Sequence, residues 1–213
     1  MKIVLIRHGK VDMKWEKNYT AEGFNGALKL YDESPLVKTE VKPMDATGYT
    51  LYVSELPRTH ETARLLFGDK EQHVTELANE VPNKAYKDSG SGPTWLWKAV
   101  GRTKWWLSLN GAAEKRRDTK ARAEKLAKEL IEKDEDCIVV AHELFLYIFS
   151  DVLAKHGFVV ERSNRFRIKN LERIRATKKD DHCGFCSHNC LLANAGCDIG
   201  REKAKKQGIV PKN

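Results

Sequence analysis

The chain has 213 residues, of which 41% are hydrophobic and 32% are charged, and its formal net charge at pH 7 is +8. This composition is ordinary for a globular protein, and the length suffices for one sizeable α/β core with a small appendage. No apolar run approaches the roughly 20 residues that a membrane-spanning helix needs, and the N-terminus lacks a secretory signal pattern, so we expect a cytoplasmic protein with no membrane partner.

The first predicted element is a buried strand that ends in three residues suited to phosphate chemistry. Residues 3–6 form an apolar run, and Arg7, His8 and Gly9 follow it directly. Ligand sites in open α/β sheets gather at the carboxyl ends of strands. An arginine fork fits phosphate oxygens, histidine can act as a nucleophile, and glycine lets the backbone approach a bound group. This strand end therefore predicts a phosphate pocket with an attacking imidazole.

A second strand end supplies another arginine. The apolar run 50–53 leads into a predicted helix over residues 57–67, with Pro57 in its first turn. Arg58 also lies on that turn, where free N–H groups and the helix dipole favour anions. We therefore expect Arg58 to contribute to the same phosphate pocket.

A third strand end supplies a second histidine. The run 137–141 is apolar and rich in β-branched residues, and His142 follows it at once, before a predicted helix over 144–156. Parallel strands in one sheet would bring Arg58 and His142 to the same edge as His8.

These motifs resemble those of the histidine phosphatase superfamily, which has the phosphoglycerate-mutase-like fold. The resemblance extends over roughly residues 1–175. It rests on the following parts of the chain: Arg7-His8-Gly9, Ser54 and Arg58 with Glu61, Thr62 and Ala63, Trp97, Arg102, Trp105 and Trp106, the helix 121–130, and Val139 to His142. It implies an α/β fold, namely a three-layer α/β/α sandwich with a mostly parallel central sheet.

The resemblance also implies a role for each residue of the pocket. His8 would be the phosphorylated nucleophile, while Arg7, Arg58 and a cationic or hydrogen-bonding His142 would hold the phosphoryl group. A carboxylate between Arg58 and His142 would protonate the leaving group, and no metal or other cofactor would take part. Such a set is chemically apt because a phosphoryl group in transfer spreads negative charge over its equatorial oxygens.

Two glutamates compete for the role of proton donor. The phosphatase branch of the family often has Glu, an apolar residue and Pro in this region, and Glu80-Val81-Pro82 matches that pattern. We therefore expect Glu80 to be the acid, with Glu76 as the alternative. Such a donor typically contributes about 10² to 10⁴ in rate.

Two positions depart from the family pattern. Lys10 stands where many members have Glu or Gln, and Glu143 stands where Gly is usual after the second histidine. The side chain of Glu143 would bring negative charge to an anion site, which puts substrate affinity in question more than the fold. Lys10 would offset that charge across the pocket mouth, unless both side chains point to solvent.

The segments between the motifs predict helices that cover the core. Residues 14–31 indicate a loop and helix over the pocket, and residues 94–109 indicate a helical lid with four tryptophans. We expect most of these tryptophans to pack in the core, since aromatic side chains bury large areas. Residues 113–132 have apolar positions at helical spacing and predict a surface helix.

The C-terminal part of the chain carries the whole charge excess. Residues 162–213 contain 13 Lys plus Arg and 5 Asp plus Glu, so their net of +8 equals that of the full chain. We therefore divide the chain into a histidine phosphatase-like catalytic domain, 1–175, and a basic Cys-rich tail, 176–213.

Four cysteines in this tail predict a metal-binding extension. Clustered cysteines in an intracellular chain bind metal more often than they form disulfides. Four thiolates fit a tetrahedral structural Zn²⁺ site, and an iron–sulfur cluster or free redox thiols are the alternatives. The predicted ligands, with His182 and His188 as substitutes, are Cys183, Cys186, Cys190 and Cys197.

The basic residues of 162–179 allow two interpretations. Lys and Arg near a metal knuckle can follow a nucleic-acid backbone. However, Phe166 and Ile168 alternate with charges as in a solvated edge strand, where Lys and Arg block aggregation. We favour the edge strand over a nucleic-acid partner.

The sequence thus predicts a phosphomonoester hydrolase that acts through phospho-His8 on a small phosphorylated substrate or a phosphoprotein. One alternative is a non-catalytic sensor of a phosphorylated ligand, or a nucleic-acid-associated protein that uses the tail; Glu143 favours this class. The second alternative is a phosphoglycerate-type mutase, which the lack of an obvious long substrate-clamping insertion disfavours.

Overall fold

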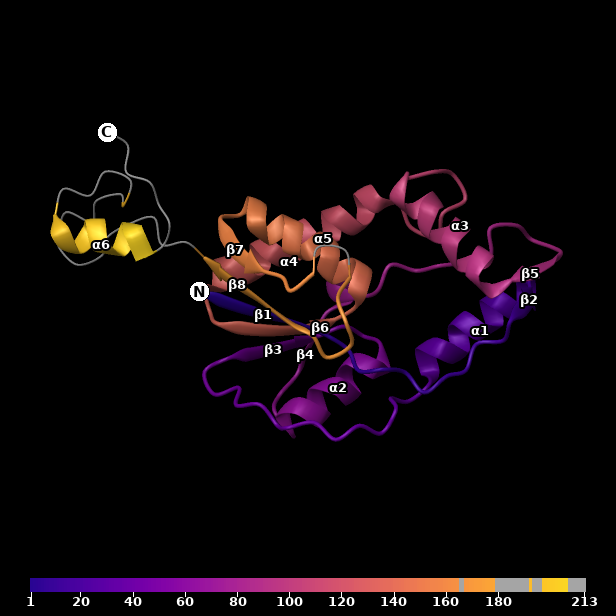
Figure 1. Cartoon of the computed structure of the whole chain (residues 1–213), viewed down its shortest axis with the longest axis horizontal. Helices are drawn as coiled ribbons and strands as arrows, with labels where there is room; N and C mark the ends of the chain where they lie inside the picture. Colours follow the sequence, from indigo (N-terminus) through magenta and orange to yellow (C-terminus); the bar gives the residue numbers. More distant parts are fainter. Residues whose placement is uncertain (165–166, 179–191, 193–196, 207–213) are drawn as a thin grey trace.

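The central sheet of the protein brings the three predicted strands together. The computed structural model describes residues 1–164, 167–178, 192 and 197–206. Within these residues the sheet has six strands (Figure 1), in the spatial order β4 (His73–Val74), β3 (Thr50–Val53), β6 (Cys137–Ala141), β1 (Lys2–Arg7), β8 (Arg173–Lys178) and β7 (Phe158–Glu161). The three apolar runs that predicted strands are β1, β3 and β6, which lie side by side at its centre.

The sheet is mostly parallel, as predicted. β6 pairs in parallel with both β1 and β3, and β3 pairs in parallel with β4. β8 runs antiparallel to both of its neighbours, β1 and β7. Ile6 and Val53 are both in register with Val140, so β1, β3 and β6 end level with one another. Residues that follow these strands therefore emerge at one edge.

Helices cover both faces of the sheet and complete the predicted three layers (Figure 1). Successive strand residues point to opposite faces, so Ile6 packs with α2 (Pro57–Phe67) on one side. Leu5 packs on the other side with α4 (Arg116–Lys133) and α5 (Glu143–Lys155).

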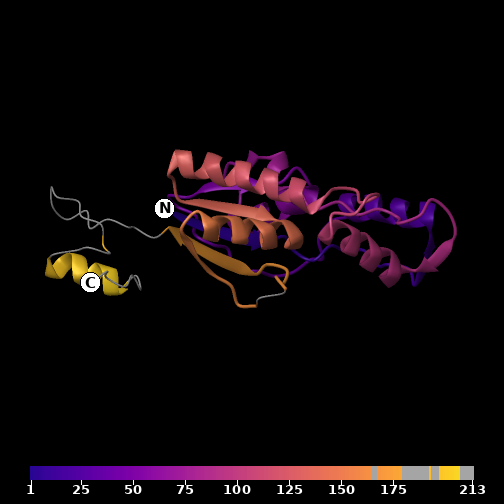
Figure 2. The same cartoon turned by 90° about the horizontal axis from the view of Figure 1, so that it is seen from above.

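A second group of elements extends the molecule beyond the carboxyl edge of the sheet (Figure 2). Its elements are β2 (Asn18–Thr20), α1 (Ala21–Glu33), β5 (Ser91–Pro93) and α3 (Thr94–Trp106). The short 3₁₀ helix η1 (Glu76–Ala78) packs instead on α4, with Leu77 and Ala78 in the main core. The rings of Phe24 and Trp97 stack 5.8 Å apart and join α1 to α3. The indole N–H of Trp97 donates to the carbonyls of Tyr19 and Gly92, both at 3.1 Å, which ties α3 to the β2–β5 pair.

The four tryptophans of α3 divide into two classes. Trp97 and Trp105 are 0% and 2% exposed, so the prediction of core packing is confirmed for them. Trp95 and Trp106 are 67% and 45% exposed. We expected most of the four tryptophans to pack in the core, and only two do. The other two lie on positions of the helix that face outward.

The C-terminal segments differ in part from the expectation. β8 ends at Lys178, which pairs with Phe158, so the boundary expected at residue 175 falls inside a core strand. β8 also lies between β1 and β7, so this part of the basic segment is not an edge strand; β7 is the edge.

The predicted metal module lies largely outside the described residues. Cys183, Cys186 and Cys190, with His182 and His188, all fall outside them. Cys197 is described and is an exposed free thiol just before α6 (Asp198–Lys206), which lies apart from the sheet in Figures 1 and 2. In the described part of the chain, no helix is long and apolar enough to cross a membrane.

Candidate active site

The carboxyl edge of the sheet assembles the residues predicted for the phosphate pocket. Arg7 is the last residue of β1 and His8 follows it. His142 follows β6 directly and precedes α5, and Arg58 is the second residue of α2. The rings of His8 and His142 lie with their centroids 5.0 Å apart. The structure thus brings these four side chains together, although they come from three separate parts of the sequence.

The imidazole of His8 is buried and has one nitrogen fixed by the backbone. His8 is 2% exposed, and the Nδ1 of its ring lies 2.7 Å from the carbonyl oxygen of Gly9. Because a carbonyl only accepts, Nδ1 carries the proton and the lone pair is on Nε2. Burial, with the charges of Arg58 and Arg7, lowers the pKa of His8 to about 3 although the Gly9 bond opposes this. The neutral, nucleophilic form therefore prevails at neutral pH.

Arg7 is held by a carboxylate as well as by the backbone. Its Nη1 donates to the carbonyl of Ile168 at 2.5 Å and forms an ion pair with Glu143 at 2.8 Å. Its Nε is buried and has no hydrogen-bond partner among the described residues. An unpaired donor in such a place is costly. Glu143 does not point to solvent alone; it reaches the arginine that was expected to bind phosphate.

Arg58 links the second histidine to a further carboxylate. Its Nε donates to Nδ1 of His142 at 3.2 Å, and its Nη1 forms an ion pair with Asp32 at 2.7 Å. The guanidinium also lies over the ring of Tyr31, 5.1 Å from the centroid. Arg58 is buried, so its charge stays close to the histidines. Asp32, which lies on α1, is a site residue that the sequence patterns did not indicate.

His142 is a buried neutral imidazole with both nitrogens engaged. Because Nδ1 accepts from Arg58, Nε2 carries the proton and donates to Oγ of Ser54 at 2.8 Å. Burial and the nearby charge of Arg58 lower the pKa of His142 well below its usual value. Of the two forms expected, the hydrogen-bonding one is favoured over the cationic one.

A set of uncharged contacts fixes the first strand end. The N–H of Gly9 donates to Oγ1 of Thr62 at 2.8 Å, and this hydroxyl in turn donates to the carbonyl of Arg58 at 2.6 Å. The amide of Asn170 donates to the carbonyl of His8 at 2.8 Å. A Cβ added to Gly9 would approach the Cδ1 methyl of Leu36 to 2.9 Å, so any larger residue there would require the Leu36 side chain to shift. Thr62 thus connects β1 to α2 directly.

A large cavity opens from these residues. Its volume is about 1030 Å³, and its lining includes Arg7, His8, Arg58 and Glu143. On the far side it is bounded by α3, where Lys98 lies with its Nζ 3.3 Å from the centroid of the Trp15 ring. Burial, with the charge of Arg102, lowers the pKa of Lys98 to about 8.

Both candidate acids line the cavity, but they differ in position. Glu80 is half-buried, and its Oε1 accepts from the N–H of Val81 at 2.8 Å. Glu76 is exposed at the start of η1. The lower exposure of Glu80 is consistent with its predicted role as the proton donor. Glu76 also lines the cavity, so a ligand there could reach either glutamate.

A metal site is not found in the described part of the chain, where no group of three or more His, Cys, Asp or Glu side chains could hold an ion. Of the predicted zinc ligands, Cys197 lies in that part of the chain, and Cys183, Cys186 and Cys190 lie outside it. Cys137 is buried in β6, and burial raises the pKa of its thiol to about 12, so the thiol stays protonated.

The fold and the cavity define an α/β protein with paired histidines and arginines at the carboxyl edge of its sheet. Residues 3–191 match the model of the histidine phosphatase superfamily (branch 1), so the chain belongs to that superfamily. The match extends beyond residue 175, where the resemblance of the motifs was expected to end. No curated protein gives a significant match to the chain.

Solved structures with a similar fold include several phosphatases. A mycobacterial protein described as hydrolase 1 has a TM-score of 0.51 and 18% identity, covering 82% of this chain and 87% of that one. A phosphoserine phosphatase variant from Entamoeba histolytica, crystallised with phosphoserine, has a TM-score of 0.50 and 16% identity, covering 82% and 89%. The α-ribazole phosphatase of Shigella flexneri has 0.48 and 19%, covering 81% and 96%. The likeness is one of fold.

Proposed function

We propose that the protein is a phosphomonoester hydrolase that acts through a phosphohistidine on His8. The observation that carries this proposal is the state of that imidazole: Nδ1 is bonded to the Gly9 carbonyl, and the pKa of His8 is lowered to about 3. The lone pair of Nε2 is therefore available beside two guanidinium groups. A neutral nucleophile flanked by fixed positive charge suits attack on a phosphate ester.

In the first step, Nε2 of His8 forms a bond to phosphorus while the bond from phosphorus to the ester oxygen breaks. Arg7 and Arg58 stabilise the charge on the equatorial oxygens, and the Nε2–H of His142 is a further donor once it turns from Ser54. Glu80, as a carboxylic acid, gives its proton to the leaving oxygen. In the second step a water attacks phosphorus, Glu80 takes its proton, and inorganic phosphate leaves His8 unmodified.

The proposal needs no metal and leaves the substrate broad. The cavity of about 1030 Å³ is large enough for a small phosphorylated molecule, and its open wall would also admit a phosphorylated side chain of a protein. Phosphatase names among the similar structures favour hydrolysis over phosphoryl transfer between hydroxyl groups, although the superfamily also contains mutases.

The nucleophile is tested by one substitution. The purified protein should hydrolyse p-nitrophenyl phosphate in the presence of a metal chelator, and His8→Ala should lower kcat by about 10⁴ or more. His73→Ala is a matched control, because His73 is an exposed residue of β4 and lies outside the cavity lining. Full activity in His8→Ala would refute the mechanism. Transfer of the phosphoryl group to a second substrate in place of water would indicate a mutase.

A non-catalytic sensor of a phosphorylated ligand is the second candidate function. The ion pair of Arg7 with Glu143, which stands where glycine is usual in the family, favours it. Tight binding of a phosphorylated ligand by the wild-type protein, without phosphate release over a screen of sugar phosphates, nucleotides and phosphoproteins, would support the sensor and contradict the hydrolase.

A further inference from the structure

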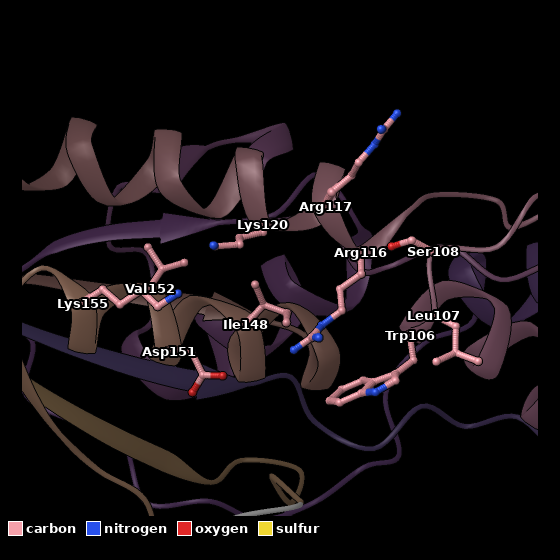
Figure 3. A pocket seen from close by; sticks show the side chains of 10 residues that line it. All are labelled: Trp106, Leu107, Ser108, Arg116, Arg117, Lys120, Ile148, Asp151, Val152 and Lys155. Carbon is pink, nitrogen blue, oxygen red and sulfur yellow. The ribbon is translucent and has the colours of Figure 1, made fainter.

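A second cavity lies on the opposite side of α4 from the catalytic one. Its volume is about 400 Å³, it is open to solvent, and it is bounded by α4, α5 and the turn that follows α3 (Figure 3). The two cavities share no lining residue in the described part of the chain. On α4, Asp118 and Arg122 face the catalytic cavity, whereas Arg116 and Lys120 face the second one. The helix therefore separates two distinct spaces.

The second cavity has an excess of positive charge. Lys120 from α4 and Lys155 from α5 extend toward one another across it, while Arg117 points away (Figure 3). Among the ion pairs of the described residues, none includes Lys120, Lys155 or Arg116. The carboxylate of the lining, Asp151, is engaged by Arg162 at 2.5 Å. Like charges that face one another in this way favour a bound anion.

The other half of the cavity is aromatic and aliphatic. Trp106 is 45% exposed, and the guanidinium of Arg116 lies over its ring, 4.1 Å from the centroid. Ile148 and Val152 from α5 line the same space. An indole plane and a guanidinium plane are both surfaces on which a planar ring stacks. The cavity thus pairs a stacking surface with uncompensated cations.

We propose that this cavity binds a nucleotide, with its base against Trp106 and Arg116 and its phosphates between Lys120 and Lys155. Inorganic phosphate would use the lysines alone, and an apolar ligand would leave the cations unpaired. A nucleoside diphosphate or triphosphate satisfies both halves, and about 400 Å³ is within the usual size range of small-ligand sites. This site is separate from the catalytic centre and independent of the proposed hydrolysis.

The test uses α,β-methylene-ADP, whose P–C–P linkage resists hydrolysis, with binding measured by titration calorimetry on the full chain. Lys120→Ala combined with Lys155→Ala should weaken binding about tenfold or more, since each removes a charged contact. Trp106→Leu should also weaken it. Lys125→Ala combined with Lys128→Ala is the matched control on exposed positions of α4 outside the cavity and should leave binding unchanged. Activity on aryl phosphate should be retained in all these variants.

Four results would overturn the proposal. The first is no binding to the wild-type chain, and the second is equal binding to the Lys120 and Lys155 double variant. The third is pyrophosphate binding as tight as that of the nucleotide analogue, which would mean that the base is not recognised. The fourth is much tighter binding of a single-stranded oligonucleotide, which would identify a nucleic-acid strand as the occupant.

Discussion

At the scale of single residues, the strand ends determine the site more than any one motif does. Arg7, His8 and His142 are placed by where β1 and β6 stop, and Arg58 by the first turn of α2. These positions could be predicted from sequence because an apolar run locates a strand and parallel strands share an edge. The two histidines then lie in a buried region of low dielectric constant, where the charge of a neighbouring arginine strongly affects their pKa.

Other site residues could not be predicted, because they reach the site only through tertiary packing. Asp32 on α1 and Asn170 in the loop before β8 have no local pattern that marks them. The ion pair between Glu143 and Arg7 is a similar case, since the sequence indicated the unusual carboxylate without indicating its direction.

Glu143 should compete with phosphate for Arg7. Glu143→Gln keeps the size of the side chain and removes its charge, so the guanidinium is freed for phosphate oxygens. We expect inorganic phosphate to inhibit aryl phosphate hydrolysis with an inhibition constant lower by about tenfold, which corresponds to about 1.4 kcal/mol. Glu132→Gln, an exposed position on α4, is the control. Unchanged or weaker inhibition in Glu143→Gln would mean that the carboxylate positions Arg7 instead.

Glu80 should matter most when the leaving group needs a proton. Glu80→Gln should slow an alkyl phosphate, whose leaving alkoxide is poor, by about 10² to 10⁴, while p-nitrophenyl phosphate is slowed far less. Steady-state kcat/KM on the two substrates measures the difference. An equal loss on both would indicate a structural role for Glu80, and Glu76→Gln would then be the variant expected to discriminate between leaving groups.

At the scale of elements, the long buried helices and central strands follow from apolar patterns, whereas the short pairings do not. β6 is buried at every residue, and α5 has apolar positions at helical spacing. The β2–β5 pair has three residues in each strand, and Trp97 donates to the carbonyls of its paired residues Tyr19 and Gly92. Short, polar strands of this kind carry too few apolar residues for a period to be recognised.

Trp97 should stabilise the packing of α1 against α3, which both border the catalytic cavity. Trp97→Ala removes the stack on Phe24 and both indole hydrogen bonds, so we expect a loss of about 3 to 5 kcal/mol in the free energy of unfolding. Hydrogen exchange should rise in α1 and α3 before it rises in the central sheet. Trp95→Ala, on the same helix but 67% exposed, is the matched control. Equal exchange in the two variants would show that the packing of α1 against α3 does not depend on Trp97.

At the scale of the whole molecule, the Cys-rich tail remains a prediction from sequence, and we expect it to bind about one Zn²⁺ per chain. Elemental analysis of protein purified without chelator would measure this, and iron with sulfide would identify the alternative cluster. Replacing its four predicted ligands by Ser should remove the metal and leave aryl phosphatase activity intact, because the catalytic set lies within residues 7–142. Absence of metal, with four freely titratable thiols in the folded chain, would contradict the prediction.

The antiparallel direction of β8 determines at which end of the sheet the C-terminal tail is attached. β1 runs toward His8, and β8 runs back beside it until the N–H of Lys178 meets the carbonyl of Met1. Six residues of strand at about 3.3 Å each place this exit about 20 Å from the nucleophile. The chain therefore leaves the sheet at Lys178, at the end opposite to the carboxyl edge where the catalytic cavity opens. Anything bound to the tail would thus be joined to the core at the end of the sheet away from His8.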